Sequence, residues 1–175
     1  MLPRFWNRIP VAWRPALARL GLNWFPAYRA TGARIVHISP DLKRATVCLP
    51  LNRRTKNGAG TLFGGSLYAA TDPIFTLLLA MNLGRDYVVW DKAASIRYRR
   101  PGRGALHAEF SVSTEDLAVV RATVEREGQC DRVFHVNFCD AQGLVHAEIE
   151  KTVYVAGKDH YRAKASARSQ PQEGA

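Results

Sequence analysis

The sequence predicts an α+β domain in which one antiparallel sheet wraps around one long, buried central helix. Several runs alternate apolar and polar residues, which is typical of half-buried strands. Residues 62–83 are apolar on nearly every side, so a helix formed there has to be buried. The runs follow the order hairpin, helix and then about four strands. A sheet enclosing the helix is the simplest arrangement that buries it.

Residues 1–30 alternate aromatic residues, arginines and prolines, and we expect short amphipathic helices broken at the prolines. Their apolar residues recur at helical spacing: Phe5, Ile9, Trp13, Leu17 and Leu20. Such helices pack on the main domain or make peripheral contact with a membrane surface, and packing is the commoner outcome. A membrane span is not expected, because Asp72 lies within the long apolar run and would cost roughly 2.5–3.5 kcal/mol in a bilayer.

The main domain is expected to cover residues 31–157. "ARIVHIS" and "RATVCLP", separated by the turn signal "PDLK", predict a hairpin. The polar loop "NRRTKNGAG" leads to the apolar helix, which should end at Gly84. Later strand-like runs are "YVVWDKAASIRYRRP", "ALHAEFSVS", "AVVRATVERE", "RVFHVNFCD" and "GLVHAEIEKTVYVAG". The polar segment 158–175 is expected to be a disordered basic tail.

The net charge of +10 favours polyanionic partners, although plain solubility explains it equally well. No recognised nucleic-acid-binding module supports a nucleic-acid partner. Three cysteines lie far apart without a CxxC pair, so neither a disulfide framework nor a metal site is expected, and a reducing cytoplasm fits. No Gly-x-Ser-x-Gly elbow is present, which argues against a serine hydrolase.

"NGAGTLFGGSLYAATD", residues 57–72, resembles the signature of hotdog-fold acyl-coenzyme A thioesterases of the phenylacetate-pathway and 4-hydroxybenzoyl-CoA thioesterase type. Those families place an Asn or Gln before a Gly-Gly turn that opens the central helix, and an acid one helical stretch later. Asn57, Gly64, Gly65 and Asp72 match that spacing. "SIRYRRPGRGALHAEFSV" resembles their strand after the helix, so the resemblance covers roughly residues 33–156. The N-terminal extension and "WDKAAS" look more like an uncharacterised thioesterase-like branch.

The resemblance implies a hotdog fold, a coenzyme A thioester as substrate, no further cofactor, and a homodimer or a dimer of dimers. Phe63 departs from the family pattern, because many relatives carry histidine before the first glycine. This departure argues against the hydratase and dehydratase hotdogs, which need a catalytic histidine.

Thioester hydrolysis needs a group that attacks or activates water and a group that stabilises the oxyanion. The helix start at Gly64 and Gly65 offers free backbone N–H groups, and the Gly65 N–H is the first candidate oxyanion donor. Asp72 is then the nucleophile or general base. Eight helical residues span about 12 Å. We therefore expect the site to combine Gly65 of one chain with Asp72 of another across a two-fold axis.

Each of these residues also has a structural interpretation. Asp72 followed by Pro73 is a common helix N-cap. Thr76 either hydrogen-bonds the carboxylate or the attacking water, or bonds back to the helix backbone. Asn57 either positions water or substrate, or serves as a turn residue before Gly58.

Substrate contacts are expected from two groups of residues. Arg97, Arg99, Arg100 and Arg103 suit the phosphates of coenzyme A, or else decorate a solvated turn. Phe63, Tyr68 and Trp90 are candidates to line the acyl pocket, with core packing as the alternative. Alternation places Lys92 with Trp90 on the inner face, where a lysine needs a carboxylate or phosphate partner.

The sequence thus predicts an acyl-CoA thioesterase with its active site at a homodimer interface. The alternative is a non-catalytic hotdog protein that binds an acyl-CoA or a lipid as a sensor or partner protein.

Overall fold

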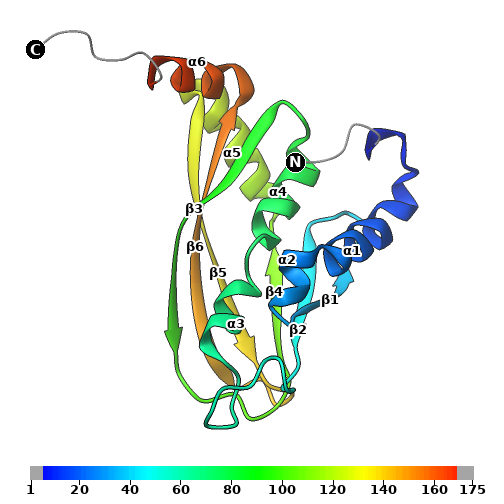
Figure 1. Cartoon of the computed structure of the whole chain (residues 1–175). Coiled ribbons are helices and arrows are strands. Elements are labelled where there is room, and N and C mark those ends of the chain that lie inside the picture. The colour runs from blue at the N-terminus through cyan, green and yellow to red at the C-terminus, as the bar shows by residue number, and fades with distance from the viewer. Residues whose placement is uncertain (1–5, 169–175) are drawn as a thin grey trace, which may run out of the picture.

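A computed structural model describes residues 6–168 of the chain. Its six strands form one sheet in the order β1-β2-β4-β5-β6-β3, with every neighbouring pair antiparallel. The strands are β1 (Arg34–Ile38), β2 (Arg44–Leu49), β3 (Tyr87–Tyr98), β4 (Leu106–Ser111), β5 (Gln129–Cys139) and β6 (Val145–Gly157). Figure 1 shows the long strands β3, β5 and β6 side by side.

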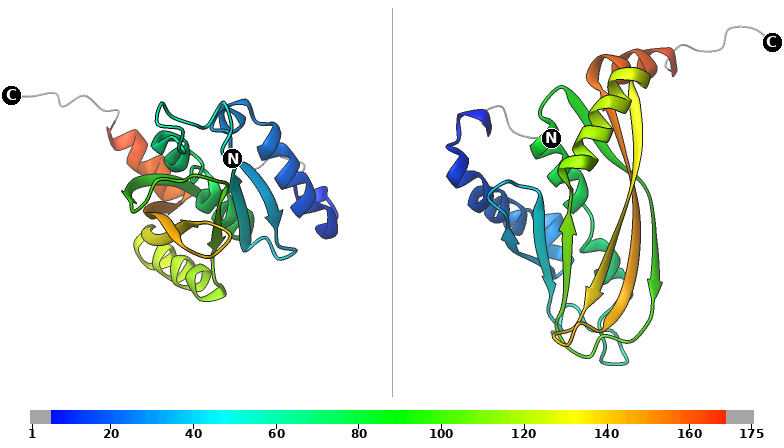
Figure 2. Two further views of the ribbon diagram at one scale, coloured as in Figure 1. Left: turned by 90° about the horizontal axis from the view of Figure 1, so that it is seen from below. Right: turned by 180° about the vertical axis from the view of Figure 1, so that it is seen from behind.

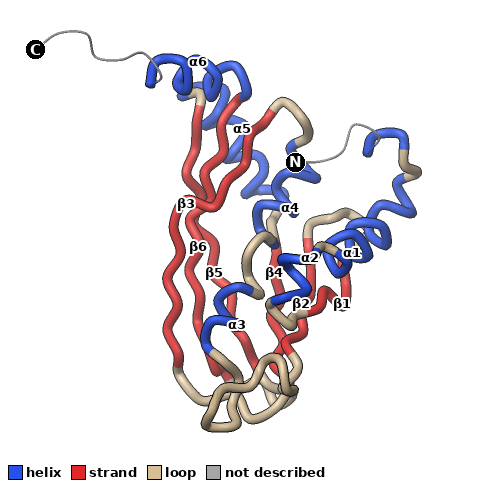
Figure 3. Tube along the Cα trace, viewed as in Figure 1, coloured by secondary structure: helices blue, strands red, loops and turns tan. Residues whose placement is uncertain are grey.

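The remaining elements are helices, which Figure 3 shows in blue. They are the short 3-10 helices η1 (Trp6–Arg8) and η2 (Val11–Trp13), followed by α1 (Arg14–Trp24), α2 (Pro26–Ala30), α3 (Gly64–Ala69), α4 (Ile74–Leu83), α5 (Thr114–Glu127) and α6 (Lys158–Arg168).

The sheet curves around α3 and α4, which together form the central helix (Figure 2). Phe75 of α4 is 1% exposed and stacks on Phe134 of β5 at 4.6 Å between ring centroids. Its ring also meets the edge of Phe110 of β4 at 5.0 Å. Because the helix is buried against both parts of the sheet, the predicted α+β hotdog architecture is confirmed.

The central helix is interrupted where the sequence places Pro73. The helix α3 ends at Ala69, and α4 begins at Ile74 with Pro73 as its N-cap residue, after a cis Asp72–Pro73 peptide bond. No side chain makes a cap hydrogen bond there, so the interpretation of Asp72 as an N-cap is wrong. Proline ends the regular helix because it lacks an N–H and its ring displaces the preceding backbone. The Asp72 side chain is thereby left for other contacts.

The run 118–127, expected to be a strand, belongs to helix α5. Ser113 and Asp116 form a capping box, in which each side chain accepts a hydrogen bond from the other residue's backbone N–H, at 2.9 Å in both cases. The buried residues Leu117, Val120 and Val124 follow a helical spacing. The local alternation of valines resembled a strand, but the cap upstream of it sets the helix.

The two edges of the sheet differ. The β1 edge is covered by α1, where Asn23 both donates to Ile35 O and accepts from Ile35 N, each at 2.9 Å. Along the outer edge of β3, no hydrogen bond from another element of residues 6–168 reaches the backbone. A long open edge is a ready template for pairing with another chain.

The segment after the sheet is more ordered than expected. Residues 158–168 form α6, and Tyr154 of β6 and Lys164 of α6 both bond Gln129 Oε1, at 3.0 and 2.8 Å. The prediction of a disordered tail is therefore wrong for residues 158–168. Residues 169–175 lie outside the described residues. No helix within the described part of the chain is both long and apolar enough to cross a bilayer.

Candidate active site

The loop before the central helix is organised by Asn57. Its Oδ1 accepts from Ala59 N at 3.0 Å and from Thr61 N at 3.1 Å, and its Nδ2 donates to Thr61 Oγ1 at 3.0 Å. These bonds are those of a turn residue. Asn57 therefore acts in this structure by shaping the loop that delivers the chain to Gly64.

The helix start presents the two glycine amides. Helix α3 begins at Gly64, and within residues 6–168 no acceptor bonds the N–H of Gly64 or Gly65. Tyr98 of β3 donates its hydroxyl to Gly64 O at 3.0 Å, which ties the helix start to the open strand. A Cβ at Gly65 would lie 2.4 Å from the Phe63 ring, so only glycine fits beneath that ring as it stands. The arrangement is a helix N-terminus with free donors at the protein surface.

Asp72 lies at the break in the central helix and forms a cluster with two residues of the sheet. Lys151 of β6 contacts Asp72 Oδ1 at 3.5 Å and Asp91 Oδ2 of β3 at 2.8 Å. The side chain of Lys151 is 3% exposed and that of Asp91 22%, whereas the side chain of Asp72 is 64% exposed. A buried lysine thus holds an exposed carboxylate from below, with a second carboxylate as its other partner.

The protonation of Asp91 is shifted by this environment. The pKa of Asp91 is raised to about 6, mainly by burial and also by the neighbouring Asp72 carboxylate, while Lys151 acts in the opposite direction. Asp91 Oδ1 is buried and has no hydrogen-bond partner among the described residues. Near neutral pH Asp91 is therefore mostly ionised, and below about pH 6 it is mostly protonated.

Replacing Asp91 with asparagine is expected to remove one pH dependence of stability. A carboxyl group whose pKa rises on folding binds its proton more tightly in the folded chain, so its stabilising effect is complete below about pH 4 and is lost as the pH rises through about 6. The free energy of unfolding of the wild type, relative to Asp91→Asn, should fall by up to about 3 kcal/mol over that range. Urea denaturation across pH measures this difference, and parallel pH curves would contradict it.

Of its two expected roles, Thr76 has the structural one, a hydrogen bond to the backbone. Its hydroxyl donates to the carbonyl oxygen of Pro73, the N-cap residue of α4, at 2.7 Å. It does not bond Asp72 in this structure, so its predicted contact with the carboxylate is not made.

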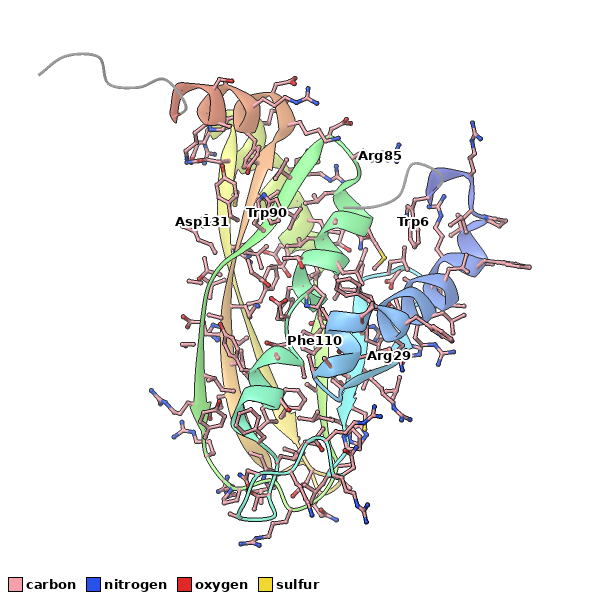
Figure 4. All side chains as sticks on the ribbon, viewed as in Figure 1. Trp6, Arg29, Arg85, Trp90, Phe110 and Asp131 are labelled. Carbon is pink, nitrogen blue, oxygen red and sulfur yellow. The ribbon has the colours of Figure 1, made fainter. Side chains whose placement is uncertain are left out.

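Trp90 and Lys92 were expected on the inner face of the sheet and lie on the opposite one. A β-bulge between Asp91 and Ala93 inserts one residue, which reverses the alternation in the first half of β3. Asp91 therefore points inward, while Lys92 forms an exposed ion pair with Asp131. Figure 4 shows Asp131 on the side of the sheet away from α4. The partner of Lys92 is a surface carboxylate.

Exposed aromatic side chains surround the helix start and the open edge. Phe63 is 55% exposed, Tyr68 of α3 40% and Tyr98 of β3 53%. Phe63 and Asp72 lie just before and just after α3, which carries Tyr68, and Tyr98 of the open strand β3 bonds the start of that helix. Such a surface is typical of a contact site, because soluble monomers rarely gather large apolar side chains in one exposed place.

Of the four arginines expected to bind the phosphates of coenzyme A, two have side-chain partners within the described residues and two do not. Arg99 pairs with Glu148 at 2.8 Å, and Arg100 donates to Val145 O at 2.8 Å. Arg97 and Arg103 are exposed, and neither forms a salt bridge or side-chain hydrogen bond within the described residues. The turn that carries Arg103 lies beside the helix start, because Leu62 N donates to Gly102 O at 2.8 Å.

The model of one protein family, a domain of unknown function named DUF4442, matches residues 16–155. The chain belongs to the DUF4442 family. No curated protein matches it.

Among solved structures, the DUF4442 chain is similar to a protein of unknown function from Pseudomonas aeruginosa described as a probable thioesterase, with a TM-score of 0.73 and 19% identity over 85% of this chain and 97% of that one. It is similar to a thioesterase from Haemophilus influenzae, with a TM-score of 0.59 and 16% identity over 78% and 87% of the two chains. A mutant thioesterase from Pseudomonas aeruginosa gives a TM-score of 0.61 and 12% identity over 80% and 92%. At these identities the likeness establishes the shared hotdog fold.

Sequence reasoning missed Lys151 and Asp91. Alternation in "AEIEKTVYV" places Lys151 in phase with the buried Ile149 and Val153, which is the signal that could have found it. Asp91 could not be found in the same way. The bulge that turns its side chain inward cannot be recognised from the pattern of apolar and polar residues in the sequence.

Proposed function

We propose that the chain is a thioester hydrolase that acts on acyl-coenzyme A as a homodimer. The observation that carries this proposal is the exposed carboxylate of Asp72, held by the buried Lys151 at the border of an open strand edge. The free amides at Gly64 and Gly65 supply the complementary half of a thioesterase site. The thioesterase descriptions of proteins with the same fold agree with this chemistry.

The dimer would form by antiparallel pairing of two β3 edges around a two-fold axis. Such a contact is self-complementary, so each copy uses the same surface. It would cover the exposed aromatic side chains beside β3 and bring the helix start of one copy to Asp72 of the other. Two equivalent sites would then flank the axis, each built from both chains.

The reaction follows from these groups. Asp72 takes a proton from water, and the resulting hydroxide adds to the thioester carbonyl carbon. The developing oxyanion accepts a hydrogen bond from the partner's Gly65 N–H, with further stabilisation from the helix N-terminus. The C–S bond then breaks, and the coenzyme A thiolate takes the proton from Asp72, leaving a carboxylic acid and free thiol. Direct attack by the Asp72 carboxylate, followed by hydrolysis of the anhydride, gives the same products.

Lys151 would hold the Asp72 carboxylate in place. Its ammonium group is buried, so its attraction for the carboxylate is screened less than at a surface. Asp91 fixes the lysine from the other side, and the three residues link the central helix to β6 and β3.

Substitution of both Arg97 and Arg103 by glutamine is expected to raise the KM for acyl-CoA by about tenfold and to leave kcat nearly unchanged. These exposed guanidinium groups have no ion pair within residues 6–168 and are suited to the phosphates, which bind alike in ground and transition states. Steady-state kinetics with acyl-CoA measures the effect, and Arg53→Gln/Arg54→Gln is the control with equal charge loss. An unchanged KM in the Arg97/Arg103 variant would exclude these contacts.

A screen of acyl-CoA chain lengths, with released thiol as the readout, tests the proposed function. We expect hydrolysis of at least one substrate class by a chain that sediments as a dimer or larger assembly. Hydrolysis by a purely monomeric chain would refute the shared site. Absence of turnover with every substrate would refute the enzyme itself.

A non-catalytic acyl-CoA or lipid binder is the second candidate, and Phe63 favours it. Its ring lies against Gly65, where a thioester carbonyl would have to approach. Measurable acyl-CoA binding without turnover, both in the wild type and in Phe63→Ala, would support this alternative. Faster turnover in Phe63→Ala would indicate that the ring only restricts access to a working site.

A further inference from the structure

The helix α1 packs on the domain through one narrow face. Ala18 is buried, and Leu22 is partly buried against the core. The Asn23 side chain forms two hydrogen bonds with the backbone of Ile35 in β1. These residues define the side of α1 that meets the sheet. The helix is therefore fixed in orientation, and its opposite side is presented outward.

The outward side of α1 is apolar as well, which is unusual for a helix on the surface of a domain. Trp13, the residue directly before α1, is 66% exposed, and Leu17, Leu20 and Trp24 of the helix are 40%, 49% and 72% exposed. Their spacing of four, three and four residues places them on one stripe, roughly opposite Ala18 and Leu22. Phe25, directly after the helix, extends the stripe and is 53% exposed. We call these five residues the α1 stripe.

Positive charge accompanies the α1 stripe without any negative charge. Residues 6–34 contain five arginines and no acidic residue. Arg8 and Arg19 are exposed in the same N-terminal segment, and the Arg29 guanidinium lies 5.8 Å from the Trp24 ring centroid. Figure 4 shows side chains of these N-terminal helices, including the labelled Arg29, at the outside of the molecule.

We propose that the α1 stripe docks the protein on an anionic lipid surface. Tryptophan and leucine side chains enter the boundary between headgroups and acyl chains, and arginines bind the lipid phosphates above it. Each arginine near such a surface adds about 1 kcal/mol of attraction. The helix would lie in the plane of the surface, with its Ala18 face still packed on the sheet. This inference does not depend on the proposed hydrolase activity.

A second copy of the chain fits the α1 stripe less well. A two-fold contact would set the same surface against itself, bringing arginines against arginines with no acid in residues 6–34 to pair them. The open β3 edge with its exposed aromatic residues lies elsewhere, on the opposite border of the sheet from β1. Anionic lipid satisfies both the apolar and the charged components of the α1 stripe.

Vesicle binding by the full chain tests this inference. Flotation is measured with phosphatidylcholine vesicles that contain or lack phosphatidylglycerol, and tryptophan emission is recorded in parallel. We expect binding to the anionic vesicles, a blue shift of the emission, and weaker binding at high salt. Leu17→Gln/Leu20→Gln should bind roughly tenfold more weakly or worse. The control Val119→Gln/Leu144→Gln changes two apolar residues of similar exposure, 40% and 45%, and should bind like the wild type.

Charge is tested separately. Arg8→Gln/Arg19→Gln should weaken binding to anionic vesicles by roughly fivefold for each arginine removed. Arg53→Gln/Arg54→Gln, with the same loss of charge in the loop before the central helix, should have a smaller effect. Failure of the wild type to float with anionic vesicles overturns the inference, and so does unchanged binding by Leu17→Gln/Leu20→Gln. A smaller assembly of that variant on sedimentation would show that a second copy covers the stripe, and would also overturn it.

Discussion

Replacement of Asp72 by asparagine is expected to reduce acyl-CoA hydrolysis by about 10³-fold or more while leaving the protein folded. Asparagine has the same size but can neither accept a proton from water nor attack a carbonyl carbon. The Asp72 side chain is mostly exposed and caps no helix, so its charge contributes little to the fold. The loss should therefore fall on kcat rather than on acyl-CoA binding.

The control for this variant is Asp86→Asn, which removes another exposed carboxylate close to the end of the central helix. Both variants should keep the wild-type thermal unfolding temperature to within a few degrees. Substantial turnover by Asp72→Asn, measured at saturating substrate, would remove Asp72 from the mechanism.

Replacement of Lys151 by methionine is expected to destabilise the fold by about 3–5 kcal/mol at neutral pH. The side chain of Lys151 is 3% exposed, and its loss leaves Asp91 without a countercharge in a partly buried position. Because burial has already raised the pKa of Asp91 to about 6, the loss should be larger at pH 8 than at pH 5, where Asp91 is mostly neutral. Chemical denaturation at the two pH values measures it.

The exposed pair of Lys92 and Asp131 provides a matched control. Their side chains are 56% and 41% exposed, so Lys92→Met should change the free energy of unfolding by no more than about 1 kcal/mol. The double variant Lys151→Met/Asp91→Leu should recover much of the stability lost in Lys151→Met, because no charge is then left buried. Equal effects of the two lysine substitutions would contradict a buried role for Lys151.

Most of the fold could be predicted because one apolar segment and several alternating runs leave few arrangements that bury both. The exceptions have local causes. Residues 118–127 alternate like a strand, yet the capping box of Ser113 and Asp116 begins a helix upstream of them. Periodicity within a short window is ambiguous between helix and strand, and here the cap decided between them.

The candidate site was predictable only where residues are close in sequence. The Gly-Gly turn and Asp72 share one segment, so their spacing is visible in the chain. The cluster with Lys151 and Asp91 joins residues of α3–α4, β6 and β3, and it depends on strand register and on a bulge. A bulge of one residue exchanges inward and outward side chains, which is why Lys92 was expected in the place that Asp91 takes.

The central claim is that each active site combines the helix start of one chain with Asp72 of the other. Gly65→Pro removes the proposed oxyanion donor at a helix position where proline is tolerated, and should lower kcat by about 10²–10³-fold. Gly65→Ala keeps the N–H and adds a Cβ against the same Phe63 ring, so it separates loss of the donor from crowding.

Mixed dimers of Asp72→Asn and Gly65→Pro chains test this claim most directly. Each variant alone should be nearly inactive, but a mixed dimer has one site with an intact Asp72 and an intact Gly65 from different chains. An equal mixture that has exchanged subunits should therefore regain roughly a quarter of wild-type turnover, because half of the dimers carry one working site of two. A mixture no more active than its two parents, with subunit exchange verified, would contradict a site shared between chains.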